Sequence, residues 1–383
     1  MDKPTVQDIF HRFYPAYLDQ YSPSPVQAKV AHNIMNCKTG AYGANVCVCE
    51  DCGFVQIHYN SCRNRCCPMC QAVPKEMWMD ARREDVLDAP YFHLVFTVPD
   101  ILNPVIYSNQ RLLYDALYHA ASSTISELTA DPKHLGAKVG YICILHTWGS
   151  EMNFHPHIHT ILLGGGLASN NQWKDNGENF FLPIRVISKM FRGKYLEELK
   201  RLWEEDKLVF HGIAEKFRNH YTFKELLDSC YGMDWIPHCK KTFNGAQTVI
   251  KYLGKYTHRI AVSNHRIVRM DDDTVTFLVK DYRNEGQWKE LTISGVEFVR
   301  RFLMHVPPRR FVRIRHYGLL CSRTKNQKLT LCRNLLGCKK YLSKLRDMEM
   351  PEILEHLYGI KVCVCKACGG HLGKPQMRMP LRC

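Results

Sequence analysis

The sequence lacks any long apolar run, although 45% of its 383 residues are hydrophobic. No stretch approaches the length of about 18 residues that a membrane span requires. The opening residues, MDKPTVQDIF, lack a basic region followed by an apolar one, so no secretory signal is expected. No internal repeat or low-complexity tract is visible, which argues against a repeat architecture. These absences favour a globular protein of the cytoplasm, where thiols stay reduced.

Acidic residues are scarce in the last fifth of the chain. From Arg300 to Cys383 there are 19 Lys and Arg against 4 Asp and Glu, whereas residues 1–299 hold 33 of each sign. The whole net charge of +15 therefore lies in the C-terminal segment. Basic and apolar residues alternate there, as in RRFVRIRHYGLL, which indicates a folded surface for a polyanion such as nucleic acid. Arg313 and Arg315 are the first candidates for binding DNA.

Strand and helix patterns alternate irregularly, which predicts an α+β fold. A buried strand is expected in YFHLVFTVPD, and a hairpin in YICILHTW and HPHIHTILL. A second hairpin is expected in TVTFLVKDYR and QWKELTI around the turn NEG. Helices are expected over residues 1–30, 109–130, 186–206 and near Tyr252. Boundaries near 75–88 and 305–311 divide the chain into domains at 1–80, 88–306 and 307–383.

Cysteine is abundant and clustered, with eight of the 18 between Cys37 and Cys70. The pairs Cys49/Cys52 and Cys67/Cys70 are two C-x-x-C knuckles separated by 14 residues. Four thiolates satisfy tetrahedral zinc, so these two knuckles are predicted to share one structural ion. The remaining residues near them could build a second site, namely Cys37, Cys47, Cys62, Cys66 and His58.

A further knuckle, Cys365/Cys368, stands in the motif CVCKACGGH near the end of the sequence. It supplies half a metal site. Cys363, His371 and Cys383 are the residues that could complete it.

Three histidines alternate along one predicted strand, in HPHIHTILLGGG. His155, His157 and His159 should share a face of that strand, with Ile158 on the other. Because Pro156 cannot donate to a ladder, His157 and His159 are the better fixed pair. Two or three imidazoles leave coordination positions open, which catalysis requires. The third ligand stays undecided between His155 and His146 of the preceding strand.

Two tyrosines, Tyr252 and Tyr256, are four residues apart in VIKYLGKYTHRIAVSN. On a helix they would share a face, one turn from each other. Lys251, Lys255 and Arg259 beside them suit an anionic substrate.

Taken together, the chain resembles the two-tyrosine rolling-circle transposases of insertion-sequence family ninety-one over most of its length. The resemblance is carried by YNSCRNRCCPMCQ, YFHLVFTVP, HPHIH, KYLGKYTHRIAVSN, DYRNEGQWKELTI and EFVRRFLMHVPPRRFVRIRHYGLL. Two departures are Cys66, where the family has histidine, and PPRR, where it more often has LPKG.

The resemblance implies an HUH-type endonuclease domain, with a central antiparallel sheet and flanking helices, between the zinc-binding domain and the basic segment. It implies that His157 and His159 hold Mg²⁺ or Mn²⁺, and that Tyr252 and Tyr256 cleave single-stranded DNA through a 5′-phosphotyrosine intermediate. The expected DNA substrates are the ends of the element and its target, in the bacterial cytosol at the nucleoid.

Two other interpretations of the residues stay open. A non-catalytic zinc-containing DNA-binding regulator would explain the cysteines and the charge, but gives the tyrosine pair no role. A metal-dependent oxygenase would use the His-x-His pair, but explains neither the charge nor the cysteines.

Overall fold

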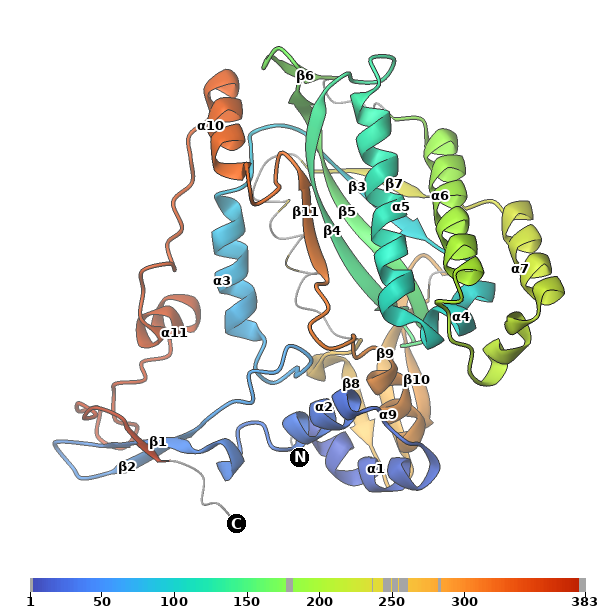
Figure 1. Ribbon diagram of the computed structural model, residues 1–383. Helices are drawn as coiled ribbons and strands as arrows, with labels where there is room; N and C mark the ends of the chain where they lie inside the picture. Colours follow the sequence, from blue (N-terminus) through green and yellow to red (C-terminus); the bar gives the residue numbers. More distant parts are fainter. Residues whose placement is uncertain are drawn as a thin grey trace.

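The computed structural model describes residues 3–176, 182–235, 237–243, 249, 254, 261–281 and 284–378. At its centre is an antiparallel sheet in the order β11-β4-β5-β3-β7, with β6 beside β5 (Figure 1). The strands are β3 (Tyr91–Thr97), β4 (Lys138–Trp148), β5 (Phe154–Leu167), β6 (Trp173–Asp175), β7 (His238–Phe243) and β11 (Ile314–Gly318). The predicted α+β class, the first strand and the first hairpin are confirmed, whereas β7 and β11 were not expected.

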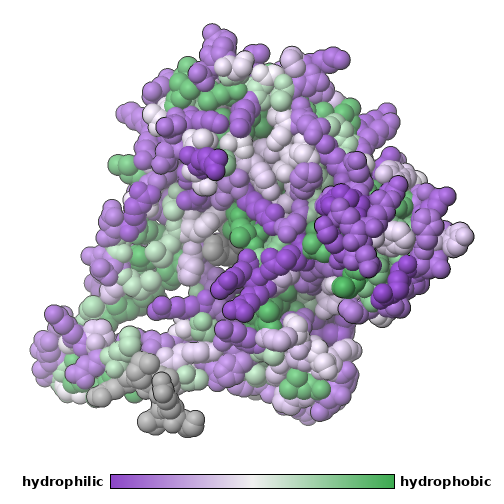
Figure 2. All heavy atoms as spheres, in the orientation of Figure 1, coloured by the Kyte–Doolittle hydropathy of each residue, from purple (hydrophilic) through white to green (hydrophobic). Residues whose placement is uncertain are grey.

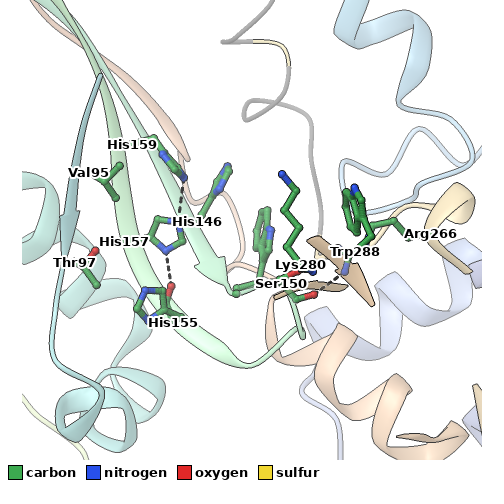
Figure 3. Close-up of a pocket in the computed structure, with 12 residues that line it drawn as sticks. Val95, Thr97, His146, Ser150, His155, His157, His159, Arg266, Lys280 and Trp288 are labelled. Carbon is green, nitrogen blue, oxygen red and sulfur yellow. Dashed lines mark hydrogen bonds between the residues drawn. The ribbon is translucent and has the colours of Figure 1, made fainter. Parts of the chain in front are cut away.

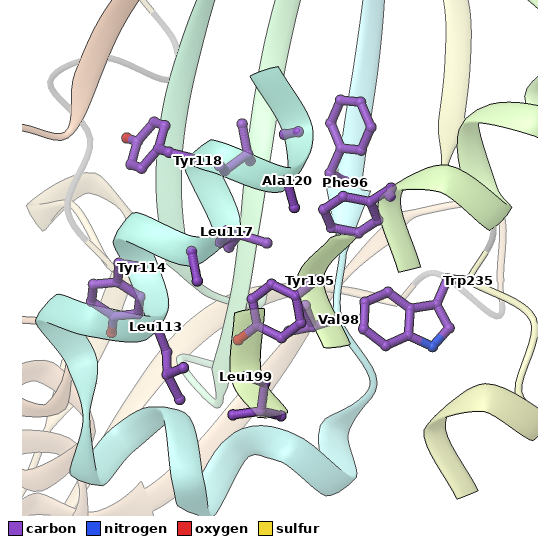
Figure 4. Packing of buried hydrophobic residues seen from close by; sticks show 14 of the residues in the cluster. Phe96, Val98, Leu113, Tyr114, Leu117, Tyr118, Ala120, Tyr195, Leu199 and Trp235 are labelled. Carbon is purple, nitrogen blue, oxygen red and sulfur yellow. The ribbon is translucent and has the colours of Figure 1, made fainter. Parts of the chain in front are cut away.

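Helices cover one face of this sheet because β4 and β5 are apolar on both sides and need cover on each. The helices there are α4 (Asn103–Ser108), α5 (Gln110–Ala130), α6 (Ile184–Glu204) and α7 (His220–Gly232). Figure 4 shows Leu117 of α5 and Tyr195 of α6 facing Phe96 of β3, with Trp235 closing the cluster. Ile158 is fully buried in this core, as the alternation along β5 predicts.

The opposite face carries the odd-numbered residues of β3 and β5 and the even-numbered residues of β4. Ile144 and Ile161 belong to a second apolar cluster on this face, together with Trp78 and Met79 of α3 (Ala72–Arg83) and Leu329 of α10 (Lys325–Leu336). The site described below lies on this same face, at the end of the strands where the histidines replace aliphatic residues.

A separate group of helices and a small sheet packs against the loop after β4. It consists of α1 (Val6–Gln20), α2 (Pro25–Met35), α9 (Gly295–Met304) and a small sheet in the order β10-β9-β8. The small sheet is formed by β8 (Ile267–Met270), β9 (Thr274–Asp281) and β10 (Gln287–Ser294), which confirms the hairpin around NEG. Capping boxes at Thr5/Asp8 and Ser24/Gln27 start two helices where one was expected. Phe10 meets Phe302 edge-on, so the first residues fold onto α9 and not onto the cysteine segment alone.

The cysteine segment forms a ribbon at one corner of the molecule (Figure 1). Its strands are β1 (Ala44–Val48), β2 (Val55–Tyr59) and β12 (Gln376–Arg378), so the third strand comes from the other end of the sequence. The chain reaches it from β11 through α10 and α11 (Met350–Tyr358). Hydrophobic side chains gather over α11 in Figure 2, where Met350 and Tyr358 are exposed.

The expected boundary at 306/307 is therefore crossed twice by strand pairing, since β11 joins the central sheet and β12 joins the ribbon. Four 3₁₀ turns complete the described structure: Gly40–Tyr42, Asp100–Leu102, Gly212–Arg218 and Asn264–Arg266. Among the helices within the described ranges, none combines the length and the apolarity needed to cross a membrane.

Candidate active site and metal centres

Three histidines converge on the face of the central sheet opposite α5 and α6. His157 and His159 stand on β5, and His146 of β4 is the cross-strand partner of His157. One ring nitrogen of each lies within 4.8 Å of the other two. The Nε2 atoms of His157 and His159 are 3.1 Å apart and point into one cavity (Figure 3). Three potential ligands are thus held by two adjacent strands.

Neighbouring groups fix the orientation of these rings. Nδ1 of His157 donates to the carbonyl of His155 at 2.7 Å, which leaves the lone pair on Nε2. Nδ1 of His159 lies 2.9 Å from Nε2 of His93 on β3. The indole of Trp148 stacks on His146 with ring centroids 4.5 Å apart. Each imidazole is therefore held by a contact on its far side.

Burial favours the uncharged form of His157 and His159. Burial lowers the pKa of His157 to about 4, and the charge of His155 adds to the effect. The pKa of His159 falls well below its usual value for the same reason, with His146 next in importance. Neutral imidazole is the form that ligates metal. An octahedral ion with bonds of about 2.1 Å separates adjacent ligand atoms by about 3.0 Å, close to the spacing of the two Nε2 atoms.

His155 does not join this cluster. Between His157 and Phe154, β5 carries one residue more than β4 does between His146 and Trp148, so a bulge falls at His155 and Pro156. The bulge turns His155 toward Asp100, whose carboxylate oxygen lies 3.3 Å from Nδ1. His155 still lines the same cavity, but its ring nitrogens lie outside the group formed by His146, His157 and His159, so His146 takes the third place here.

The cavity in front of the histidines has a volume of about 330 Å³ and extends to the small sheet. Its far wall is formed by Arg266, Lys280 and Trp288 (Figure 3). Lys280 Nζ lies 5.4 Å from the centre of the Trp288 ring, and the Arg266 guanidinium lies 5.8 Å from it. Trp288 is half exposed. Sequence reasoning missed this wall, because the strand pattern of TVTFLVK and QWKELTI does not say which surface the hairpin faces.

The expected nucleophiles Tyr252 and Tyr256, with Lys251, Lys255 and Arg259, lie outside the described residues. Residues on either side of them are described. Ala261 accepts a hydrogen bond from Arg266, which lines the cavity. Gly254 approaches α3 so closely that a β-carbon there would collide with Met79.

One cysteine cluster is built within the N-terminal region. Cys37, Cys62, Cys67 and Cys70 bring their sulfurs within 4.8 Å of one another. Cys37 and Cys67 are fully buried in the core beneath α1 and α2. Sulfurs of Cys62 and Cys70 are 3.8 Å apart, the spacing expected on a tetrahedral zinc ion.

The second cluster corrects the predicted pairing of knuckles. Cys49 and Cys52 do not meet Cys67 and Cys70; they meet Cys365 and Cys368. The reason is the β1–β2 hairpin, which places one knuckle at its tip and the other beyond its base. Five residues of strand span about 16 Å, too far for one ion to bridge.

The other residues considered for a second zinc site stand apart from both clusters. Cys66 is buried, which raises the pKa of its thiol, and its backbone N–H binds the side chain of Asn64. Cys47 packs in the small core of the ribbon. His58 lies 2.6 Å from the amide nitrogen of Gln56. Cys363 is exposed, and Cys383 lies outside the described residues.

The two arginines expected to bind DNA have partners inside the protein. Arg315 pairs with Asp115, and its guanidinium lies 4.0 Å from the centre of the Tyr118 ring. Burial lowers the pKa of Arg313, which lies near Cys66. Both stand on or beside β11, so they contribute to the packing of the central sheet.

Two family models match the chain, one over the N-terminal cysteines and one over the three histidines. The family model described as "Transposase zinc-binding domain" matches residues 9–98, and the model described as "Putative transposase" matches residues 140–328. The protein "Putative transposase y4qJ" of Sinorhizobium fredii is 40% identical over 369 residues, which cover 95% of this chain and 93% of that protein. The transposase for insertion sequence element IS801 of Pseudomonas savastanoi pv. phaseolicola is 30% identical over 309 residues, 79% of this chain and 72% of that one.

Among solved structures, the conjugative relaxase TrwC in complex with oriT DNA is 12% identical, covering 67% of this chain and 96% of that one, with a TM-score of 0.27.

Proposed function

This chain belongs to the insertion-sequence transposases that carry a cysteine-rich zinc-binding domain, and we propose that it cleaves and rejoins single-stranded DNA at the histidine cluster. The observation that carries the proposal is the convergence of His146, His157 and His159 on one cavity, whose far wall carries Lys280 and the exposed indole of Trp288.

In this proposal the three imidazoles hold Mg²⁺ or Mn²⁺. Such an ion polarises a phosphoryl oxygen of DNA and stabilises the negative charge that develops in the displacement. The neutral state of the buried rings and the carbonyl of His155 behind His157 favour the role of ligands over that of proton carriers. Three ligands from one side leave the cavity side open to a phosphate.

The proposed nucleophile is the hydroxyl of Tyr252 or Tyr256. Its oxygen attacks phosphorus, the P–O3′ bond breaks, and O3′ leaves with a proton as a free 3′-OH, while the 5′-phosphate stays on the tyrosine. Attack by a 3′-OH on that linkage rejoins a strand and releases the tyrosine without ATP. Lys251 and Lys255 would stabilise the phenolate or the phosphate.

The far wall of the cavity suits a single strand. An exposed indole stacks on unpaired bases, and nearby cations track the phosphates. Trp288 and Lys280 offer this combination facing the histidines, whereas Arg266 is buried and donates to three backbone carbonyls. We propose that the ends of the element and its target pass through this space.

The test is a cleavage assay on single-stranded oligonucleotides from the ends of the encoding element, with Mg²⁺ or Mn²⁺. We expect a DNA adduct that survives boiling in detergent and that disappears when Tyr252 and Tyr256 are both changed to Phe. Each single variant should keep some adduct and lose strand transfer, because one tyrosine must hold the first end while a second cleavage is made.

Tyr221→Phe is the matched control, because Tyr221 is exposed on α7 and is not among the residues that line the cavity. Peptide mapping identifies the linked residue; Tyr252 is our preferred first nucleophile. DNA binding without any adduct would instead favour a non-catalytic regulator, and DNA on neither tyrosine would refute the proposal.

A further inference from the structure

The ribbon is closed by residues from opposite ends of the sequence. Cys49 and Cys52 stand at the tip of the β1–β2 hairpin, and Cys365 and Cys368 approach from 313 and 319 residues away. We propose that these four thiolates bind a second structural zinc ion that fastens the C-terminal segment to the N-terminal ribbon. This inference is independent of the proposed DNA cleavage.

Sulfur spacing is the first argument. Cys49 Sγ lies 3.6 Å from Cys368 Sγ, and Cys52 Sγ lies 3.7 Å from Cys365 Sγ. A tetrahedral ion with Zn–S bonds of about 2.3 Å separates its sulfurs by about 3.8 Å, whereas a disulfide needs about 2.05 Å. The four sulfurs are therefore spaced as the ligands of one zinc ion. Both distances are close to the 3.8 Å between the sulfurs of Cys62 and Cys70 in the first cluster.

Backbone geometry of the C-terminal knuckle supports thiolates. The N–H groups of Ala367 and Gly370 each point at a ligand sulfur two residues earlier, at 3.4 Å. Donors of this kind favour the charged form of the sulfur. The double glycine has a reason as well: Gly369 has a φ of +77°, and a β-carbon on Gly370 would collide with Asp51.

Backbone pairing brings the two halves together directly after the C-terminal knuckle. Gly373 N–H donates to Val48 at 2.9 Å, and Glu50 N–H donates to the carbonyl of His371 at 3.1 Å. Strand β12 then pairs with β1. The two ends of the sequence are thus joined by backbone hydrogen bonds within one sheet.

Apolar burial at this junction is too small to hold it. The buried cluster consists of Cys47, Cys49, Cys365 and Leu372, so two of its four members are themselves proposed ligands. Small modules with so little core depend on a metal for their fold. The ion supplies the stability that the missing core does not.

The segment fastened in this way also runs along α3. Asp80 of α3 accepts hydrogen bonds from Tyr341 and Leu345, and Glu84 pairs with Arg346. The C-terminal segment therefore connects β11 of the central sheet, α3 and the ribbon, and the zinc ion sets its far end.

Thiol alkylation of the intact wild-type chain tests the inference without any variant. Cys52, Cys368 and Cys363 are all exposed, and only the first two are proposed ligands. We expect iodoacetamide to modify Cys363 at once, and to modify Cys52 and Cys368 together only after a zinc chelator is added. Modification of Cys52 and Cys368 as fast as Cys363 before chelation would overturn the inference.

Zinc content provides a second measurement. Cys365→Ser with Cys368→Ser should lower bound zinc by one equivalent per chain, and Cys49→Ser with Cys52→Ser should lower it by the same amount. Cys363→Ser is the matched control and should lower it by none. An unchanged zinc content in either double variant would contradict the shared site.

Discussion

The cysteine clusters and the histidine cluster use their ligands in opposite ways. Each cysteine cluster gathers four sulfurs, which fill a tetrahedral ion, and the first is buried beneath helices. The histidine cluster gathers three nitrogens from one side of a sheet and opens on a cavity. A filled coordination shell can only stabilise, whereas an open one can act on a substrate. The proposed structural zinc sites and the proposed catalytic metal site are thus formed by separate groups of residues.

The largest effect is expected in the first cysteine cluster. Cys67→Ser should abolish soluble expression, because a structural zinc ion contributes about 10 kcal/mol or more, comparable with the whole stability of a domain. Cys66→Ser is a matched control, since Cys66 is equally buried but outside the cluster. It should stay soluble with a loss of about 1–3 kcal/mol. Soluble yield and bound zinc measure both; a soluble, zinc-free Cys67→Ser protein would break the comparison.

A buried histidine outside the metal cluster should affect only how the free energy of unfolding depends on pH. His305 contacts Thr147 and the carbonyl of Met152, and burial lowers its pKa to about 4. The unfolded chain takes up a proton near pH 6.5 while the native state stays neutral, so the free energy of unfolding falls as the pH drops from 6.5 to 4. The expected contribution is on the order of 3 kcal/mol.

Denaturant unfolding at pH 7 and pH 4.5, with the wild type and the variant in the same buffers, checks the contribution of His305. His305→Gln should reduce the loss between the two pH values. An identical loss in the variant and the wild type would assign the pH dependence to other groups.

The exposed wall of the cavity should affect binding and not stability. Trp288→Ala should weaken binding of single-stranded DNA by about 1–3 kcal/mol, the usual value of one base stacked on an aromatic ring. Its melting temperature should stay close to that of the wild type, because the side chain is half exposed. Fluorescence anisotropy with a labelled oligonucleotide measures the affinity. Unchanged affinity would remove the wall from the proposed path of the strand.

The smallest effects separate two kinds of arginine in the basic segment. Arg315→Ala should destabilise the protein by about 1–2 kcal/mol, because it loses the ion pair with Asp115 and the contact with Tyr118. Arg309 is exposed, so Arg309→Ala should leave stability unchanged. It should reduce the slope of log affinity against log salt concentration by about one, because one phosphate contact is lost. DNA affinity measured from about 50 to about 200 mM salt distinguishes the two variants. A stability loss in Arg309→Ala together with a changed salt dependence in Arg315→Ala would contradict the assigned roles.

What the sequence predicted well follows strict periods. The alternation of β5 located His157 and His159 on one face and Ile158 on the other, because strand geometry leaves no freedom. His146 was a candidate because it lies on the preceding strand of the expected hairpin. His155 lies outside the group of three because the bulge at His155 and Pro156 shifts the period by one residue.

What the sequence could not predict depends on loops and on long-range pairing. A C-x-x-C knuckle defines half a site and gives no information on its partner, so Cys49/Cys52 were assigned to the nearest knuckle in sequence. Their partner, Cys365/Cys368, is brought near by β12, which is only three residues long. Charge counting likewise located a basic segment but could not show that Arg315 is used inside the protein.

The most direct test of the central claim is the adduct assay on the double variant His157→Ala/His159→Ala in Mg²⁺ or Mn²⁺. We expect the covalent DNA adduct to fall at least about 100-fold, the usual cost of losing charge stabilisation at a reacting centre. Binding of single-stranded DNA should stay within several-fold of the wild type, because most affinity comes from backbone contacts elsewhere. His119→Ala, at an exposed position of α5, should retain both properties. Undiminished adduct formation by the double variant would contradict the assignment of the open histidine cluster as the catalytic metal site.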